Sequence, residues 1–202
     1  MSTKLYLALA IVSLGASANA AITFIEGGGG IPISETVQFN DPGLILTGPV
    51  VTGMGNTTGA IIEFFGAGED LQAVAAGAAR VSGLDGAFTN LSIGLEDPML
   101  AFTGIEINLI ALGTGEVTIT GHSTKGGTAM ATFDVSKNGN NRYSVIATIP
   151  DYISFIEISS TVEIGDVRQI RFNAETVVPE PGSFIALGVG VLLLAARRRR
   201  HF

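Results

Sequence analysis

The feature that most constrains the fold of this chain is the spacing of its apolar residues. From Ile33 onward, short apolar segments are interrupted by Gly, Asn or Asp every eight to twelve residues. Between Ile105 and Leu109 the apolar residues alternate with Glu106 and Asn108, and a period of two is typical of a half-buried strand. Regularly spaced short strands predict an all-β, antiparallel fold that is either a sandwich or a barrel. Of the two, we expect a β-sandwich of jelly-roll type.

Eight segments are apolar enough for strands and end near turn-forming residues. The predicted strands cover residues 60–65, 88–95, 105–109, 117–120, 129–135, 143–149, 153–159 and 167–172. Short turns join the strands of the second half, which predicts an antiparallel meander there. Residues 71–79 have helical spacing and many alanines, so a short helix and an extended segment are both open at that place.

The first twenty residues have the pattern of an export signal. Lys4 precedes an apolar stretch at residues 5–14, and small residues follow up to Ala18, Ala20 and Ala21. This order predicts a secretory signal peptide over residues 1–20, a helix too short for a stable membrane span, with cleavage between Ala20 and Ala21. The alternative is a buried N-terminal helix. We expect the glycines of residues 27–30 to form a flexible lead-in within the body, residues 21–176.

Residues 177–202 combine a rigid motif, an apolar run and a block of cations. The motif is Pro179, Glu180, Pro181 and Gly182, and the cations are Arg197, Arg198, Arg199 and Arg200. Each proline locks φ at about −65°, so we expect an extended segment that a processing enzyme can grip. A single transmembrane helix is expected at residues 183–196. It is short for a hydrocarbon core of about 30 Å, and the arginines should stay on the cytoplasmic side.

Together these three features resemble the PEP-CTERM sorting domain of Gram-negative bacteria. The resemblance implies recognition by exosortase, a membrane-embedded cysteine transpeptidase or protease. It also implies a precursor anchored in the inner membrane, followed by delivery to the cell surface or the exopolysaccharide matrix. The body is similar to the β-sandwich modules that commonly precede this tail, with residues 164–172 as the closing strand. The alternative is an ordinary C-terminal membrane anchor with a chance Pro-Glu-Pro.

The charge of the body limits its partners. Without the terminal segments it keeps 6 basic and 17 acidic residues, a net charge of −11. Such a surface repels nucleic acid and anionic lipid, so neither is expected to bind the body. The chain has no cysteine, which excludes disulfides and thiolate metal ligands, and no tryptophan, which weakens an interpretation as a broad sugar-stacking platform.

Candidate chemistry in the body is sparse. His122 is the single histidine outside the tail, and we expect it at an exposed turn. No nucleophile elbow accompanies it, as a catalytic triad would need, and one histidine cannot anchor a zinc site. Arg168 and Arg171 are three apart in a predicted strand, so we expect them on opposite faces. We therefore assign no catalytic residue, no cofactor site and no metal site. A structural calcium ion remains an alternative, because calcium prefers carboxylate, amide and carbonyl oxygens. The acidic groups that could supply them are Glu69 with Asp70, Glu96 with Asp97, and Asp134 with Asn138 and Asn140.

These observations predict a non-enzymatic, exported surface or matrix protein of structural or adhesive type. Its expected partners are signal peptidase and the general secretion machinery, and then exosortase. Contact with the membrane is expected through the tail before processing. Two alternatives stay open: a module that binds carbohydrate such as exopolysaccharide, with or without structural calcium, and a secreted hydrolase.

Overall fold

The computed structural model describes residues 21–29, 32–75, 79–137 and 139–177. Outside these ranges lie the predicted signal helix and the predicted transmembrane helix at residues 183–196. Of the predicted processing residues, Ala21 alone lies inside them. Across the described ranges, no helix has the length and apolar character needed to cross a membrane.

The described chain is built from strands, and every pairing between them is antiparallel. Their bounds are β1 (Ile22–Glu26), β2 (Glu35–Gln38), β3 (Thr47–Gly48), β4 (Val50–Gly55), β5 (Ile61–Phe65), β6 (Leu71–Val74), β7 (Arg80–Gly83), β8 (Phe88–Leu95), β9 (Leu100–Ala111), β10 (Gly115–Ser123), β11 (Thr128–Val135), β12 (Asn141–Ala147) and β13 (Ile153–Thr176). The prediction of an all-β, antiparallel fold is confirmed.

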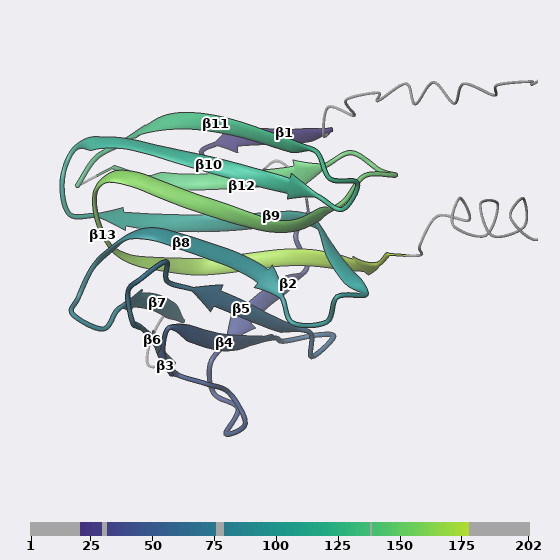
Figure 1. Ribbon diagram of the computed structural model, residues 1–202, viewed down its shortest axis with the longest axis horizontal. Coiled ribbons are helices and arrows are strands. Elements are labelled where there is room, and N and C mark those ends of the chain that lie inside the picture. The colour runs from purple at the N-terminus through teal and green to yellow at the C-terminus, as the bar shows by residue number, and fades with distance from the viewer. Residues whose placement is uncertain (1–20, 30–31, 76–78, 138, 178–202) are drawn as a thin grey trace, which may run out of the picture.

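The strands form two layers that share β13 (Figure 1). The front layer has the order β11-β10-β13-β8-β5-β4, and the back layer has the order β1-β12-β9-β13-β2. Residues 153–160 of β13 pair with β10 and β8, whereas residues 166–176 pair with β9. The pairing of β2 with β4 joins the layers a second time. The short strands β3, β6 and β7 flank this junction, with β7 paired to β13.

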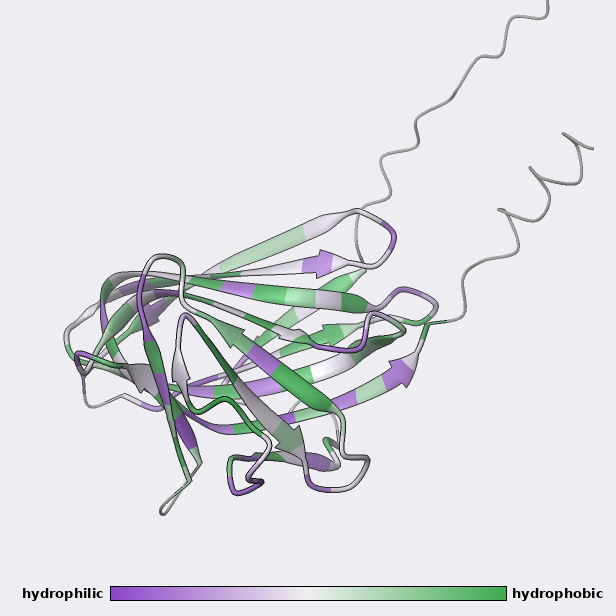
Figure 2. Cartoon of the chain, turned by 60° about the horizontal axis from the view of Figure 1, so that its bottom comes forward, coloured by the Kyte–Doolittle hydropathy of each residue, from purple (hydrophilic) through white to green (hydrophobic). Residues whose placement is uncertain are grey.

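The core lies between the two layers and follows from the period-two pattern. Ile105, Ile107 and Leu109 of β9 are completely buried, and Figure 2 shows apolar and polar residues interspersed along the strands. A Cβ added to Gly121 of β10 would lie 3.0 Å from Ile22 of β1, so the layers touch at this glycine. Each buried aliphatic or aromatic side chain contributes about 1.5–3 kcal/mol relative to an exposed one. Burial of this alternating set therefore fixes which face of each strand points inward.

One open question about local structure is decided and one expectation is wrong. Of the two possibilities open at residues 71–79, residues 71–74 take the extended one and form strand β6, which pairs with both β3 and β7. The second half is not a meander, since β9 pairs with β12 and β13 and not with β10. The turn at residues 112–114 carries the chain from the back layer to the front layer. Among the predicted neighbours in that half, β10 and β11 do form a hairpin.

Of the glycines predicted to form a flexible lead-in, Gly27, Gly28 and Gly29 pack against the body, whereas Gly30 lies outside the described residues. Gly27, Gly28 and Gly29 have φ values of 89°, 73° and 82°, a region that favours glycine. The amide of Gly29 donates a 2.8 Å hydrogen bond to Glu106 Oε2, and a Cβ on Gly28 would clash with Cδ of Arg142. Close packing against the outer face of the back layer, where Glu106 is only 4% exposed, therefore requires glycine at Gly28, whereas at Gly27 and Gly29 the positive φ alone favours it.

A bulge in β13 overturns the prediction that Arg168 and Arg171 lie on opposite faces. Arg168 pairs with Asn108 and Arg171 pairs with Glu106, so three residues of β13 span two of β9. Gln169 within the bulge has a φ of 52°. Residues three apart in a regular strand point to opposite faces, but the extra residue in the bulge removes this offset. Both arginines therefore lie on the outer face of the back layer.

Both ends of the described chain lie at the same end of the molecule (Figure 1). Ile22 pairs with Ala147 at the end of β12, and Thr176 pairs with Leu100 at the start of β9.

Candidate functional site

The outer face of the front layer carries a continuous polar surface across three central strands. The residues that alternate with it, such as Ile119, Ile156 and Ile93, are buried in the core. Cross-strand pairing places Thr120 beside Glu157 and Glu157 beside Ser92, so one row runs directly across the layer. We call this surface the polar face; its central members are Asn90, Ser92, Thr118, Thr120, His122, Phe155, Glu157 and Ser159.

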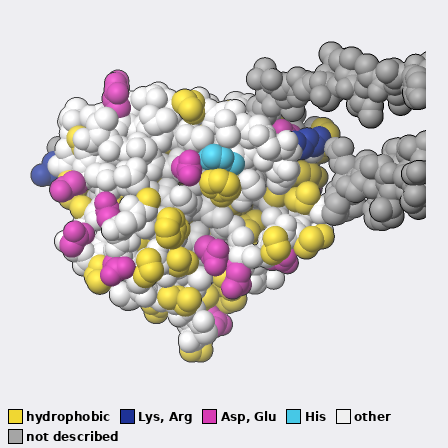
Figure 3. Space-filling view, viewed as in Figure 1, with side chains coloured by type: hydrophobic (Ala, Val, Ile, Leu, Met, Phe, Trp, Pro, Cys, Tyr) yellow, Lys and Arg dark blue, Asp and Glu magenta, His cyan; other side chains and the backbone are white. Residues whose placement is uncertain are grey.

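A stacked pair of rings lies at one side of the polar face. The ring of His122 stacks on the ring of Phe155, with centroids 3.9 Å apart and planes inclined by 11°. Nε2 of His122 lies 2.9 Å from Oε2 of Glu157. Figure 3 looks onto this face, where the histidine lies beside an acidic and an apolar side chain.

The structure corrects the expectation that His122 occupies an exposed turn. His122 belongs to β10, and its side chain is 24% exposed. Its stacking on Phe155 and its contact with Glu157 fix the orientation of the ring. Residues 122 and 157 are 35 positions apart, so only the strand register brings them together, and no local motif could have shown it.

A hollow of about 230 Å³ opens on the polar face next to Glu157. Its lining contains hydroxyl, amide and carboxylate groups, so it can both donate and accept hydrogen bonds. The lining residues are Ala67, Asn90, Leu91, Ser92, Thr118, Thr120, Glu157, Ile158 and Ser159.

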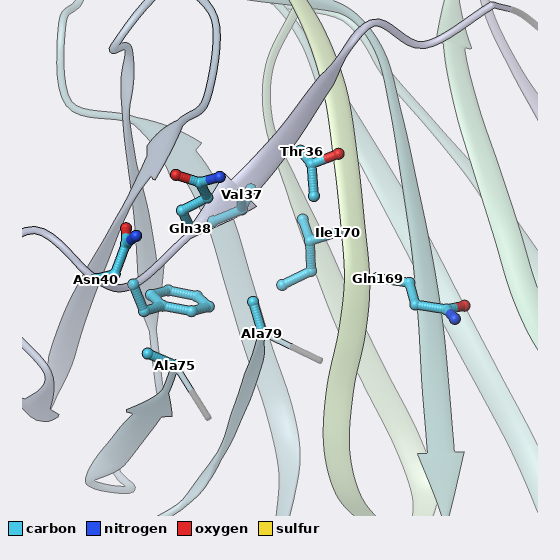
Figure 4. Close-up of a pocket in the computed structure, with 9 residues that line it drawn as sticks. Thr36, Val37, Gln38, Asn40, Ala75, Ala79, Gln169 and Ile170 are labelled. Carbon is cyan, nitrogen blue, oxygen red and sulfur yellow. The ribbon is translucent and has the colours of Figure 1, made fainter. Parts of the chain in front are cut away.

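A second hollow, of about 380 Å³, lies between β2 and the β13 bulge (Figure 4). Gln38, Asn40 and Gln169 contribute amides, while Val37 and Ile170 contribute apolar surface. None of the lining residues is ionisable, so this hollow offers no group for acid–base catalysis.

The acidic pairs do not come together as a metal site within the described ranges. Glu69 and Asp70 border a hollow of about 450 Å³ together with Asp85. Asp97 instead accepts a 2.8 Å hydrogen bond from the amide of Met99, as turn residues do. No three His, Cys, Asp or Glu residues of the described chain are grouped so that they could hold a metal ion. Asn138 lies outside these ranges.

The sorting tail begins directly where the folded body ends. Thr176 is the last residue of β13, and the amide of Val177 donates a 2.8 Å hydrogen bond to the carbonyl of Met99. The chain is therefore hydrogen-bonded beside the start of β9 as far as Val177, two residues before Pro179.

No curated protein matches the sequence. One solved structure with a similar chain is a variant of a family 29 carbohydrate-binding module, at 11% identity and a TM-score of 0.29, over 77% of this chain and 92% of that chain. Another is BiXyn10A CBM1 in its apo form, at 12% identity and a TM-score of 0.24, over 76% of this chain and 96% of that chain. Similarity at such low TM-scores carries no argument about fold or ligand.

A family model gives the decisive comparison. Residues 177–200 match the PEP-CTERM protein-sorting motif, the family that the tail of the sequence resembles. The matched segment starts at Val177, the residue after β13, and includes Pro179, Glu180, Pro181 and the four arginines. The motif implies an exported protein that exosortase recognises. The chain therefore carries a PEP-CTERM protein-sorting motif at residues 177–200, joined directly to an all-β body.

Proposed function

We propose that this protein is a non-enzymatic surface or extracellular-matrix component, exported through a signal peptide over residues 1–20 and sorted by exosortase through its C-terminal motif. The observation that carries the proposal is the match at residues 177–200, which begins where the closing strand ends. The net charge of −11 over residues 21–176 favours solubility of the body outside a Gram-negative cell.

The position of the motif matters for how the processing enzyme meets the body. Pro179 follows the hydrogen-bonded Val177 by two residues, which span at most about 7 Å of extended chain. An enzyme that acts on the motif must therefore bind close to the end of the body where both ends of the described chain lie. The roles of the parts follow from their chemistry: Pro179 and Pro181 keep the motif extended, residues 183–196 hold it at the bilayer, and the arginines stop translocation.

Processing can be tested by the mass and location of the protein in cells with and without exosortase. With exosortase, the surface fraction should contain a polypeptide that lacks Arg197, Arg198, Arg199 and Arg200. Without it, or in Pro179→Ala and Glu180→Ala variants, the intact tail should stay in the membrane fraction. Glu175→Ala, an exposed acidic residue just before the motif, serves as the matched control and should be processed normally. A surface polypeptide that keeps the four arginines in the presence of exosortase would refute the proposal.

A second function, binding of a neutral polysaccharide, is favoured by the polar face. The Phe155–His122 pair offers a small apolar platform, and the hollow beside it supplies hydroxyls, amides and the Glu157 carboxylate. Sugar rings need this combination of an apolar contact with paired donors and acceptors. The negative body disfavours acidic polysaccharides, so the expected ligand is uncharged.

Binding to a panel of neutral and acidic polysaccharides tests this second function. Phe155→Ala should weaken binding of a neutral glycan about two- to twelvefold, since an aromatic contact is worth about 0.5–1.5 kcal/mol. Leu84→Ala, an exposed apolar residue in the turn before β8, is the control and should bind as the wild type does. Equal affinity of the Phe155→Ala variant would exclude the polar face. Binding that falls when a chelator is added would instead reveal a structural calcium ion.

A further inference from the structure

Asp151 is a buried carboxylate at the end of the molecule where both ends of the described chain lie. It is 8% exposed and lies between β12 and β13. Its Oδ1 accepts hydrogen bonds from the hydroxyl of Ser123 and, at 3.0 Å, from the amide of Tyr152. Within the described ranges, no basic side chain forms an ion pair with it. A buried carboxylate of this kind is costly without a compensating charge.

The remaining oxygen of Asp151 is directed at the first described residue. The nitrogen of Ala21 lies 3.3 Å from Oδ2 of Asp151. The carbonyl of Ala21 in turn accepts a 2.8 Å hydrogen bond from the amide of Thr148, and Thr148 accepts one of 3.0 Å from the amide of Asp151. Both the nitrogen and the oxygen of Ala21 are therefore held by the loop between β12 and β13.

Ala21 is also the residue at which the sequence predicts cleavage of the signal peptide. Hydrolysis consumes one water molecule, breaks the bond between the carbonyl carbon of Ala20 and the nitrogen of Ala21, and leaves a carboxylate on Ala20. The freed amine of Ala21 takes up a proton at neutral pH, because the ordinary pKa of an α-amino group is about 8. The neutral amide donor opposite Asp151 thus becomes an ammonium group.

We propose that Asp151 is the binding site for the mature N-terminal ammonium group of Ala21, and that removal of the signal peptide completes the fold by forming this part-buried ion pair. The inference rests on the export step of the proposed function. It also gives this carboxylate a compensating charge, which no ion pair among the described residues supplies before cleavage. A cut one residue earlier or later would move the ammonium group by about 3.5 Å and separate the charges.

The position of the charge can be tested without altering any side chain. Two forms of the chain beginning at Ala21 are compared in thermal melts, one with a free amino group and one with an acetylated amino group. Acetylation keeps an N–H donor but removes the charge, so we expect Tm to fall by about 3–6 °C, the size of change that one buried charged hydrogen bond gives in a domain of this length. A third form that begins at Ala20 should melt with the acetylated one.

Substitution of the acceptor provides the matched comparison. In an Asp151→Asn background, acetylation should change Tm by less than about 1 °C, whereas in an Asp97→Asn background the full loss should remain. Asp97 is an exposed turn carboxylate and serves as the control. The comparison of free and acetylated wild-type chains decides the question even if Asp151→Asn fails to fold.

The two possible failures are distinguishable. Intact mass of the exported protein identifies its first residue, and any residue other than Ala21 would overturn the inference while leaving the sorting tail untouched. If Ala21 is the first residue but the free and acetylated forms melt together, export stands and the ion pair is wrong.

Discussion

Tyr143 provides the sharpest test of how the core is assembled. Its side chain is 1% exposed, its ring packs on Phe133 with centroids 4.8 Å apart, and its hydroxyl donates a 3.3 Å hydrogen bond to the carbonyl of Asp134. Burial, and then the nearby charges of Glu26 and Asp134, raise the pKa of Tyr143 from 10.0 to about 12. The protonated phenol is therefore the form that the fold favours.

The sign of the stability effect follows from this direction. A group whose pKa is raised in the folded state stabilises the protein fully below its unfolded pKa and loses that contribution as the pH rises through its folded pKa. Between about pH 10 and pH 12, ionisation of Tyr143 should thus lower the free energy of unfolding by about 2–3 kcal/mol. This magnitude follows because a tenfold difference in proton affinity between the folded and unfolded states is worth about 1.4 kcal/mol.

The assay uses the absorbance of phenolate at alkaline pH. Tyr152 is the second tyrosine of residues 21–176, so a Tyr152→Phe variant leaves Tyr143 as the single titrating phenol of the body. Its absorbance should rise near pH 12, together with loss of the fold, and urea unfolding of Tyr143→Phe should show a weaker dependence on pH in this window. A Tyr143 that ionises at pH 10 while the protein stays folded would refute the burial described above.

Three further predictions concern packing and surface contacts. Gly83→Ala should destabilise the fold by about 3 kcal/mol or more in urea unfolding, because its Cβ would clash with the carbonyl oxygen of Ala87; Gly94→Ala, whose Cβ would meet nothing closer than 3.6 Å, should change stability by less than about 0.5 kcal/mol. Glu106→Ala should cost about 1–3 kcal/mol and speed hydrogen exchange at the amide of Gly29, and unchanged exchange there would contradict the contact. Asp166→Asn removes a contact with Arg168 that consists of two hydrogen bonds, of 2.7 and 2.6 Å. The arginine side chain is 32% exposed, so the free energy of unfolding should fall by no more than about 1 kcal/mol. A larger fall would show that the pair is better shielded from water than this exposure indicates.

The sequence predicts those parts of the fold in which burial alone determines the structure. The strand predicted at residues 88–95 is β8 with the same bounds, because the alternation of apolar side chains directly reports which face is buried. Which strands pair with one another cannot be predicted from this alternation. Several strands present similar apolar faces, so the pattern in β9 could not show that it lies beside β12 and β13 rather than β10.

The polar face could not be predicted from the sequence for a related reason. Phe155, Glu157 and His122 come from two strands whose register no local pattern determines, and a slip of one residue would turn each side chain to the other face. The bulge at Gln169 contains no glycine or proline that would mark it in the sequence. The sequence therefore could not predict that Arg168 and Arg171 share a face. The sorting tail was predictable because its signals are local in the sequence.

The passage of β13 through both layers determines how the body bears mechanical load. In the membrane-anchored precursor that we propose, the last residues of β13 lead straight into the tail, so drag on the body would be transmitted along this strand. Residues 166–176 pair with β9 along the direction of such a pull. The inter-strand hydrogen bonds are perpendicular to the strands, so the force loads this ladder in shear. The hydrogen bonds then share the force instead of opening one after another. A body tethered in this way resists traction most strongly through the strand that holds its two layers together.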